Sequence, residues 1–341
     1  MIGDVKYRLA KATGIPAMMN RINRNRPVIL AYHGMYDGHS KNEIYPDTFI
    51  HVDDYVKQLL FIKSKYNIIS PDDLQSALEK KIDIAPHSAL ITFDDGYESF
   101  YRLAFPVLKS MNIKALVFIP TEYVEKQIPF WFDVAVFFLK TTNNEGRKWL
   151  DQLLGVQSLN LEKELFNSIC LSKMKKLLSK DRDYIIEQMM YIMKDEFVQS
   201  VVCKNFYPMS EEDILKISTE EMMIGGHTHR HVILTNMPDD MAEKEITINK
   251  DKLERLINKP CLFFAYPNGC IGDFHDKHKT ILKKAGYIGA FTIMQKRARP
   301  LKDPMAISRI HIAPEDTIQS IDFHCSGVAL SRTLRNLIKF G

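Results

Sequence analysis

Two adjacent carboxylates end an apolar run that predicts a buried strand. The chain reads ALITFDDGY over residues 89–97, so Asp94 and Asp95 follow the strand directly. Neighbouring side chains on an extended chain point in different directions, so one carboxylate can bind a metal ion while the other accepts a proton. That division of roles suits metal-assisted hydrolysis. The alternative for Asp94, Asp95 and Gly96 is a simple Asp-Gly turn.

A second set of candidate ligands lies about 130 residues further on, where residues 225–231 read GGHTHRH. If the chain forms a helical turn after a strand over 221–226, His227 and His231 project from one side of it. Two imidazoles and one carboxylate leave an open position on a tetrahedral zinc ion, which is the pattern of a catalytic site. A solvated, His-rich turn is the alternative. His229 is expected to face elsewhere.

These segments resemble the first two motifs of the polysaccharide deacetylases, the NodB-homology group of carbohydrate esterases. Further segments resemble signatures of one branch of that family, which looks circularly permuted: ILAYHG over 29–34, FAYPNG over 264–269 and SRIHI over 308–312. The resemblance covers roughly residues 27–312, with a poorly matched middle. It implies a distorted (β/α) barrel of about seven strands, an architecture that places catalytic groups at the carboxyl ends of the strands.

The resemblance also implies roles for the paired residues. Asp95, His227 and His231 would hold a divalent metal ion. Zinc suits this mixture of imidazole and carboxylate, with Co²⁺, Ni²⁺ or Mn²⁺ as alternatives. Asp94 would be the general base, and a nearby cation would favour its ionised form.

One position departs from the family pattern. Many relatives carry an Arg just before the Pro-Tyr of the third motif, where this chain has Ala265. Arg309 is the candidate substitute for that cation, and a surface salt bridge is the alternative.

The loop after Ala265 is predicted to offer a backbone N–H group to the oxyanion of the reaction. A plain β-turn is the alternative for the same residues. The loop consists of Tyr266, Pro267, Asn268 and Gly269.

Two histidines are candidates for the general acid that protonates the leaving amine. His33 lies in a segment that loosely resembles the family's last motif, moved to the front of the chain. His311 lies on the last predicted strand, where alternation puts it on the same face as Arg309. His33 is preferred, and a structural histidine is the alternative for either.

Two aromatic residues are candidates for contact with the sugar, namely Tyr97 and Trp131. Trp131 belongs to the segment 129–133, which reads PFWFD, and three consecutive aromatic side chains cannot all face one core. One of them could therefore stack on a sugar ring, while aromatic anchors for the neighbouring helices are the ordinary alternative.

The periodicity predicts alternating strands and helices and hence an α/β fold with a mainly parallel sheet. Capping boxes predict helix starts after Ser70 and Ser210. Residues 121–209 read as a helical insertion near the open end of the barrel, within a barrel domain over 27–329. The predicted strands cover 27–33, 66–70, 88–93, 114–120, 221–226, 261–266, 289–293 and 306–312.

The composition is that of an ordinary globular protein: 341 residues, 45% hydrophobic and 26% charged. Five cysteines without a Cys-x-x-Cys pair predict a reducing compartment. Segment 1–26 contains no stretch apolar enough for a signal peptide or a membrane span, so a cytoplasmic location is predicted.

Basic residues gather at the two ends of the chain. Six basic residues against one acidic residue give segment 1–26 a net charge of +5, and tail 330–341 carries +3. The whole chain carries +4, so the part between the ends carries −4. These ends could contact an anionic membrane surface, with solvated helix faces as the alternative. Nothing indicates a nucleic-acid groove.

The leading functional hypothesis is a metal-dependent hydrolase that removes N-acetyl groups from a sugar in a glycan or a glycan precursor. Two alternatives are an O-acetyl esterase or other amide hydrolase that uses the same site, and a glycan-binding protein that has lost catalysis.

Overall fold

The computed structural model describes residues 12–38, 48–156, 161–177, 179–199 and 203–328, together with positions 7 and 10. The basic tail predicted for 330–341 lies outside these residues, as does most of the chain before residue 12. The contact of the two basic ends with an anionic membrane therefore stays a prediction from the sequence.

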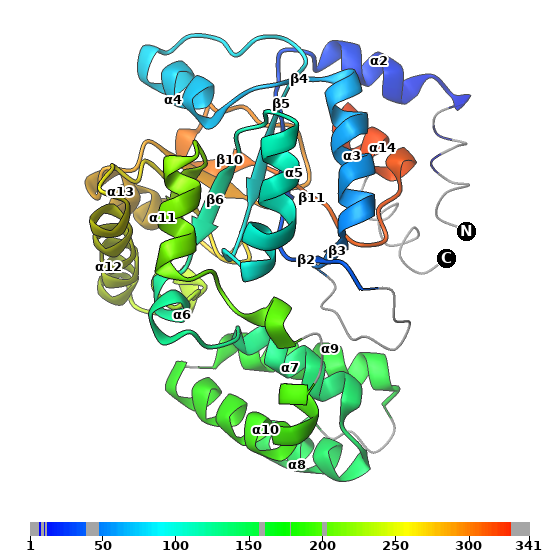
Figure 1. Cartoon of the computed structure of the whole chain (residues 1–341), viewed down its shortest axis with the longest axis vertical. Coiled ribbons are helices and arrows are strands. Elements are labelled where there is room, and N and C mark those ends of the chain that lie inside the picture. The colour runs from blue at the N-terminus through cyan, green and yellow to red at the C-terminus, as the bar shows by residue number, and fades with distance from the viewer. Residues whose placement is uncertain are drawn as a thin grey trace.

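Parallel strands form a nearly closed barrel surrounded by helices (Figure 1). The strand order is β10-β9-β8-β7-β6-β5-β1-β11, and each pair along it is parallel. Only Arg309 separates β10 from β11, so one interrupted last strand pairs with β9 and with β1 and brings the two edges together. The predicted barrel is confirmed, and the ring has about the predicted number of strands when β10 and β11 are taken as one. The strands are β1 (Val28–Tyr32), β5 (Ser88–Phe93), β6 (Leu116–Ile119), β7 (Met223–Gly226), β8 (Phe263–Ala265), β9 (Gly289–Thr292), β10 (Ile307–Ser308) and β11 (Ile310–His311).

Three short strands lie outside the ring. β4 (Asn67–Ile68) pairs with β5 away from the ring. A short parallel pair, β2 (Met35–Tyr36) and β3 (Ile50–His51), was not predicted because two residues are too few to show a period.

The strands are apolar throughout because both of their faces are covered. Every residue of β1 and β5 is buried. Ile29 and Leu90 belong to one apolar cluster, whereas their neighbours Leu30 and Ile91 belong to another. This alternation separates the side chains that fill the barrel from those that pack under the helices.

Helices follow most of the strands and cover the outside of the barrel. The capping boxes predicted after Ser70 and Ser210 are confirmed, since each serine exchanges hydrogen bonds with the aspartate three residues later. A turn of π-helix over Phe100–Ala104 leads into α5. The covering helices are α3 (Val52–Lys65), α4 (Pro71–Lys80), α5 (Phe105–Ser110), α11 (Glu211–Thr219), α12 (Asp239–Ile257), α13 (Asp276–Lys284) and α14 (Ile318–Ser326).

Most of the chain between β6 and α11 forms a separate helical layer, which lies at the bottom of Figure 1. It has a hydrophobic core of its own, which Phe49 and Tyr97 enter from the barrel side. Lys175 joins this layer to the barrel loops, because its Nζ donates to Asn268 Oδ1 at 3.3 Å and its carbonyl accepts from Asn236 at 2.7 Å. The helices of the layer are α7 (Trp131–Thr141), α8 (Asn144–Leu154), α9 (Lys163–Lys176) and α10 (Ser179–Gln199), and α6 (Thr121–Lys126) precedes them and packs against α12.

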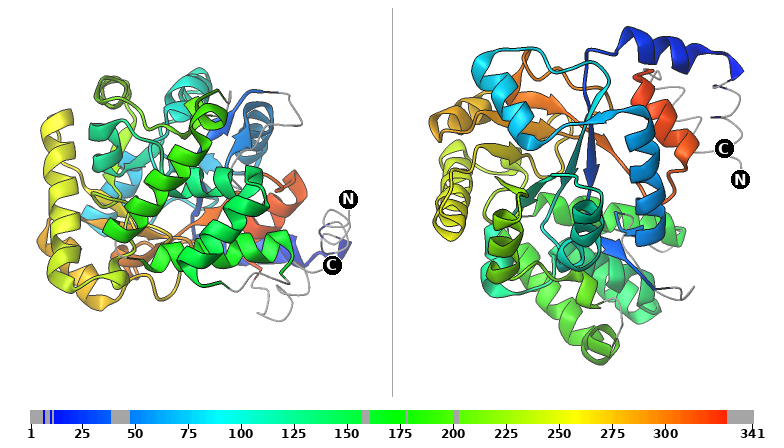
Figure 2. Two further views of the ribbon diagram at one scale, coloured as in Figure 1. Left: turned by 90° about the horizontal axis from the view of Figure 1, so that it is seen from below. Right: turned by 45° about the horizontal axis from the view of Figure 1, so that its top comes forward.

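Helix α2 (Ile15–Ile22) lies at the opposite end of the molecule from this layer and packs against α14 (Figures 1 and 2). Its outer face exposes Ile15, Met18 and Ile22 by 47%, 56% and 62%. None of the described helices is both long and apolar enough to cross a membrane.

Candidate active site

Asp94 and Asp95 leave β5 in a sharp turn that separates their side chains. Asp95 has a φ of 71° and Gly96 a φ of 67°, so two successive residues take the left-handed conformation. This conformation is costly for Asp95, and residues held in it often belong to functional sites. Both carboxylates are buried.

The loop after β7 carries His227 and His231, and it is not the helical turn that the spacing predicted. Residues 227–233 form no helix. Thr228 and His231 have φ values of 59° and 50°, in the left-handed region, so the segment is not a right-handed helical turn. The loop is fixed at both ends, because Thr228 Oγ1 accepts from Val232 N–H at 3.0 Å and Asn249 Oδ1 accepts from His227 N–H at 3.0 Å.

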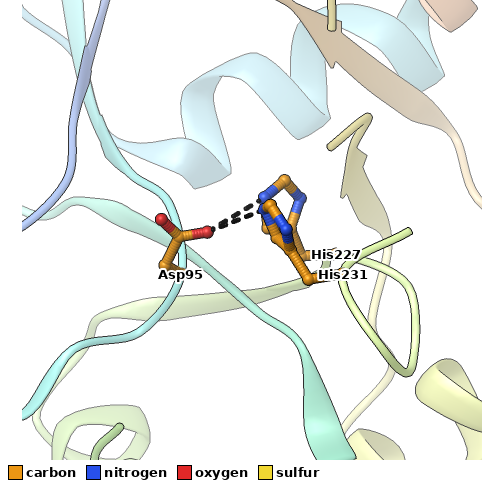
Figure 3. Close-up of side chains that lie close together, drawn as sticks. All are labelled: Asp95, His227 and His231. Carbon is orange, nitrogen blue, oxygen red and sulfur yellow. Dashed lines mark ion pairs between the residues drawn. The ribbon is translucent and has the colours of Figure 1, made fainter. Parts of the chain in front are cut away.

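This loop brings both imidazoles onto Asp95 (Figure 3). Asp95 Oδ1 lies 3.4 Å from His227 Nε2 and 3.1 Å from His231 Nε2. Bonds of about 2.1 Å to one tetrahedral ion would put two ligand atoms about 3.4 Å apart, so these separations fit a shared metal ion. Among the described residues, no donor makes a well-aligned hydrogen bond to the buried Asp95 Oδ1. The three residues therefore fit a divalent ion.

The protonation of this group also suits a metal ion. His227 Nδ1 lies 2.7 Å from the carbonyl oxygen of Ala265. Donation to that carbonyl leaves the lone pair on Nε2, which faces Asp95. Burial would raise the pKa of Asp95, but the electrostatic interaction with His231 and the contacts with both histidines hold that pKa well below its usual range. Burial lowers the pKa of His231; Asp95 opposes that effect, and Arg182 adds to it.

Asp94 pairs with Arg309. The two guanidinium Nη atoms donate to the two carboxylate oxygens at 2.6 and 2.7 Å, and Arg309 is fully buried. A further bond runs from Arg309 to Thr92 Oγ1 at 3.1 Å. Burial would raise the pKa of Asp94, but Arg309 outweighs that effect with the help of His227, so the pKa is lowered. Arg309 thus occupies the place at which an Arg at position 265 was expected to act.

The two candidate general acids lie side by side next to Asp94. His33 Nε2 is 3.9 Å from Asp94 Oδ2, and the rings of His33 and His311 have centroids 5.1 Å apart. The pKa of His311 is lowered to about 3, first by burial and then by His33. His311 is therefore neutral at pH 7.

In the loop predicted to hold the oxyanion, most backbone N–H groups already donate hydrogen bonds within the protein. The N–H group of Tyr266 donates to Phe291 O at 3.0 Å and that of Gly269 to Pro267 O at 2.8 Å, while Pro267 has none. Only the backbone N–H of Asn268 remains in this loop as a donor. The Tyr266 side chain is buried as well, and its hydroxyl donates to Met305 O at 2.9 Å.

The prediction that Tyr97 and Trp131 contact a sugar is wrong for this structure, because both side chains are buried in the core of the helical layer. Tyr97 is fully buried and donates to Asp133 Oδ2 at 2.7 Å. Trp131 is 6% exposed. Of the three consecutive aromatic residues, Phe132 lies beside the site, with its ring 5.0 Å from that of His231.

Asn249 is a site residue that the sequence did not reveal. It is fully buried on α12, accepts from His227 N–H and donates to Ile119 O at 2.9 Å. It therefore links the loop after β7 to the end of β6. The available signal was weak, since Asn249 stands where the spacing of Ile246 and Leu253 would place an apolar residue.

A second Asp-His-His group, formed by Asp239, His275 and His278, has a less suitable geometry. The two histidine rings are stacked, with centroids 3.7 Å apart and an interplanar angle of 19°. Lone pairs in nearly parallel ring planes do not converge on one ion. The rings of His227 and His231, by contrast, are inclined at 68°. Lys277 also pairs with Asp239 at 3.0 Å.

Comparisons with known proteins show the family and the fold of the chain. The family model "Polysaccharide deacetylase" matches residues 81–290, and no curated protein matches the sequence. The fold resembles Streptococcus pyogenes deacetylase PplD in complex with acetate, with 18% identity, 87% of this chain and 96% of that chain covered, and a TM-score of 0.57. It also resembles IcaB from Ammonifex degensii, with 19% identity, coverage of 89% and 98% and a TM-score of 0.55.

A third similar structure is a de-N-acetylase from Aggregatibacter actinomycetemcomitans, with 16% identity, coverage of 88% and 99% and a TM-score of 0.54. At these identities the likeness speaks for the fold alone. The family model spans more than half of the sequence and includes Asp94, Asp95, His227 and His231. The chain therefore belongs to the polysaccharide deacetylase family.

Proposed function

We propose that this chain is a metal-dependent hydrolase that removes N-acetyl groups from an N-acetylated sugar in a glycan or a glycan precursor. One observation carries the proposal. A buried carboxylate paired with an arginine, Asp94 with Arg309, lies next to a separate set of metal ligands. A general base and a metal ion side by side are what amide hydrolysis needs.

Asp95, His227 and His231 would hold the ion, and zinc is the metal that suits this mixture of imidazole and carboxylate ligands. When bound, such an ion polarises the acetamide carbonyl and lowers the pKa of water towards about 7. The chain supplies the rest of the ligand geometry through Ala265 O, which orients His227, and through Asn249, which fixes the loop.

Asp94 would accept the proton of the attacking water. It must be ionised to do so, and Arg309 keeps its pKa below the usual range despite burial. Because Arg309 holds both carboxylate oxygens, it also fixes the direction in which Asp94 faces. The proton that Asp94 gains must then be matched by one delivered to the leaving amine.

His33 is the preferred donor of that proton. It lies beside Asp94, whereas the lowered pKa of His311 makes His311 a poor acid near neutral pH. His311 would then support His33 across their ring contact.

Two other functions remain as alternatives. An O-acetyl esterase would use the same residues. Its leaving group, an alcohol, depends less on proton donation than an amine does, so it would have less need of His33 as a general acid. A glycan-binding protein that has lost catalysis would have no need for the Asp94–Arg309 pair, so the intact pair disfavours it.

Acetate release decides among these functions. The purified chain would be incubated with N-acetylated oligosaccharides, O-acetylated sugars and acetylated nucleotide sugars, and free acetate would be measured. Release from the N-acetylated substrates supports the proposal. Release from O-acetyl sugars alone supports the esterase, and release from none supports a binding protein.

We further propose a peripheral contact with an anionic membrane through α2, in a cytoplasmic protein. Ile15, Met18 and Ile22 form an exposed apolar face, and Arg21 and Arg24 lie beside it. Such a face with flanking basic residues suits an interfacial helix.

A further inference from the structure

Arg182, on α10, is a buried cation that has neither a hydrogen-bond acceptor nor an ion pair among the described residues. Its side chain is only 4% exposed, and its Nε is buried without a hydrogen-bond acceptor. No ion pair or hydrogen bond to its guanidinium occurs within the described ranges. Burying a charged group without an acceptor is costly, so a retained arginine of this kind suggests an acceptor from outside the chain.

Contacts between rings connect Arg182 to the candidate active site. Its guanidinium carbon lies 4.7 Å from the ring centroid of Trp131. The Trp131 ring lies 5.6 Å from that of Phe132, and Phe132 lies 5.0 Å from the metal-ligand candidate His231. The underlying helices, α7 and α10, run next to each other (Figure 1). Arg182 therefore lies beside the site on the side of the helical layer.

Two other arginines of the chain have hydrogen-bond acceptors within the protein. Arg230, on the loop after β7, donates to Glu245 at 2.6 Å. Arg147, on α8, also stacks on an aromatic ring, with its guanidinium carbon 4.6 Å from the ring centroid of Phe166, but it donates to Leu161 O at 3.5 Å. Asp183 follows Arg182 in sequence and interacts with its charge, yet the two side chains form no ion pair among the described residues. Arg182 therefore differs from Arg147 and Arg230, because no acceptor is present for it among the described residues.

We propose that Arg182 binds an anionic group of the sugar substrate, a phosphate or a carboxylate, near the acetamide that is cleaved. This inference rests on the proposed deacetylase function. A guanidinium forms two parallel hydrogen bonds with either group, and Trp131 holds it in one plane. The substrate would then be a phosphorylated sugar precursor or a glycan that contains uronic acid.

Activity on matched substrates tests this subsite and distinguishes its two sources. The three substrates are N-acetylglucosamine 1-phosphate, the methyl glycoside of an N-acetylated aminouronic acid, and neutral methyl N-acetylglucosaminide. We expect Arg182→Met to lower kcat/KM for one anionic substrate about tenfold or more relative to the neutral one, the range of a charged hydrogen bond. Arg182→Lys should restore part of that preference. The affected substrate identifies phosphate or carboxylate.

A binding measurement keeps this test separate from the deacetylase proposal. The chain has two tryptophans, so in a Trp149→Phe background the emission comes from Trp131 alone. Glucose 1-phosphate and methyl glucuronide carry the anions without an amide, and methyl glucoside is the neutral reference. One of the anions should change Trp131 emission, and Arg182→Met should weaken its binding about tenfold or more.

Arg147→Met is the matched control, since it removes a stacked arginine from the same layer away from the site. It should leave the anion preference and the titration as in the parent. The proposal is overturned if Arg182→Met affects all three substrates alike, if the anion titrations do not change, or if Arg147→Met behaves as Arg182→Met does. A protein that binds an anion through Arg182 but releases no acetate would refute the deacetylase function and leave the anion site standing.

Discussion

Asp94 and Asp95 are adjacent in sequence but have different partners. Arg309 holds Asp94, whereas the two histidines face Asp95. The left-handed backbone of Asp95 produces this separation, because it turns the second carboxylate away from the direction of the first. The same residues therefore form a turn and supply a candidate metal ligand.

The two carboxylates should respond differently to the same substitution. Asp94→Asn should retain the metal ion and lower kcat by about 10²-fold or more, since it removes the base. Asp95→Asn should weaken metal binding instead, because an amide is a poorer ligand. Metal content and kcat of both variants would be measured together. The reverse pattern would exchange the two roles.

Of the two histidines next to Asp94, His311 is the weaker candidate for the general acid. A general acid must be protonated, and burial lowers the pKa of His311 to about 3, so His311 is neutral over the working range. We therefore expect His33→Ala to lose amide hydrolysis, to keep the metal ion and still to cleave an aryl acetate, whose phenolate leaves without a proton. The decline of kcat at alkaline pH should flatten as well.

His311→Ala is the comparison for that variant and should affect the amide and the ester alike. Selective loss of amide hydrolysis in His311→Ala would instead place the acid on the last strand. It would also contradict the permuted reading of the segment around His33.

At the scale of elements, the strands were predictable because each is an apolar run bounded by turn residues. The segment 88–93 was predicted with the bounds that it has in the structure. The acidic and histidine residues at the strand ends followed from the same pattern. The loop from His227 to His231 was not predictable, because its positive φ values depend on bonds to Asn249 and Thr228 that a local spacing does not reveal.

The contact of Arg309 with Asp94 could be proposed but not deduced from sequence. It depends on the last strand closing the barrel against β1, which lies nearly 280 residues earlier in the chain. The burial of Trp131 likewise depends on how the helical layer folds, and its aromatic neighbours gave no local sign of which ring faces the core.

Substitution of Asn249 tests whether α12 positions the loop after β7, which carries His227 and His231. Asn249→Ala leaves His227 N–H and Ile119 O without their partner, so the free energy of unfolding should fall by about 1–3 kcal/mol. Metal affinity should fall with it. Urea unfolding and metal titration would measure both quantities.

Thr247→Ala is the matched control on the same helix, because Thr247 bonds only within its own helix. Its effect should stay within about 0.5 kcal/mol, as is usual for surface substitutions. An unchanged metal affinity in Asn249→Ala would show that the loop holds its shape without α12.

At the scale of the whole molecule, the helical layer and α2 lie at opposite ends (Figure 1). The metal-ligand candidates lie on the side of the helical layer, since Phe132 of α7 contacts His231. A chain that rests on a membrane through α2 would therefore present its site to the aqueous phase. That arrangement suits a substrate that extends into solution.

Vesicle sedimentation tests this orientation. The full chain should bind vesicles that contain phosphatidylglycerol more strongly than neutral ones, because basic residues flank the apolar face. Met18→Ser combined with Ile22→Ser should reduce that binding. Leu215→Ser removes an exposed apolar side chain from α11 and should not reduce it. Equal binding by all these variants would contradict contact through α2.

Acetate release from an N-acetylated sugar before and after metal removal tests the central claim most directly. The protein as purified should contain close to one divalent ion per chain and release acetate. Chelation should abolish the release, and one equivalent of zinc should restore it in the parent but not in His231→Ala. Undiminished release from the metal-free protein, or full metal occupancy in His231→Ala, would contradict the account.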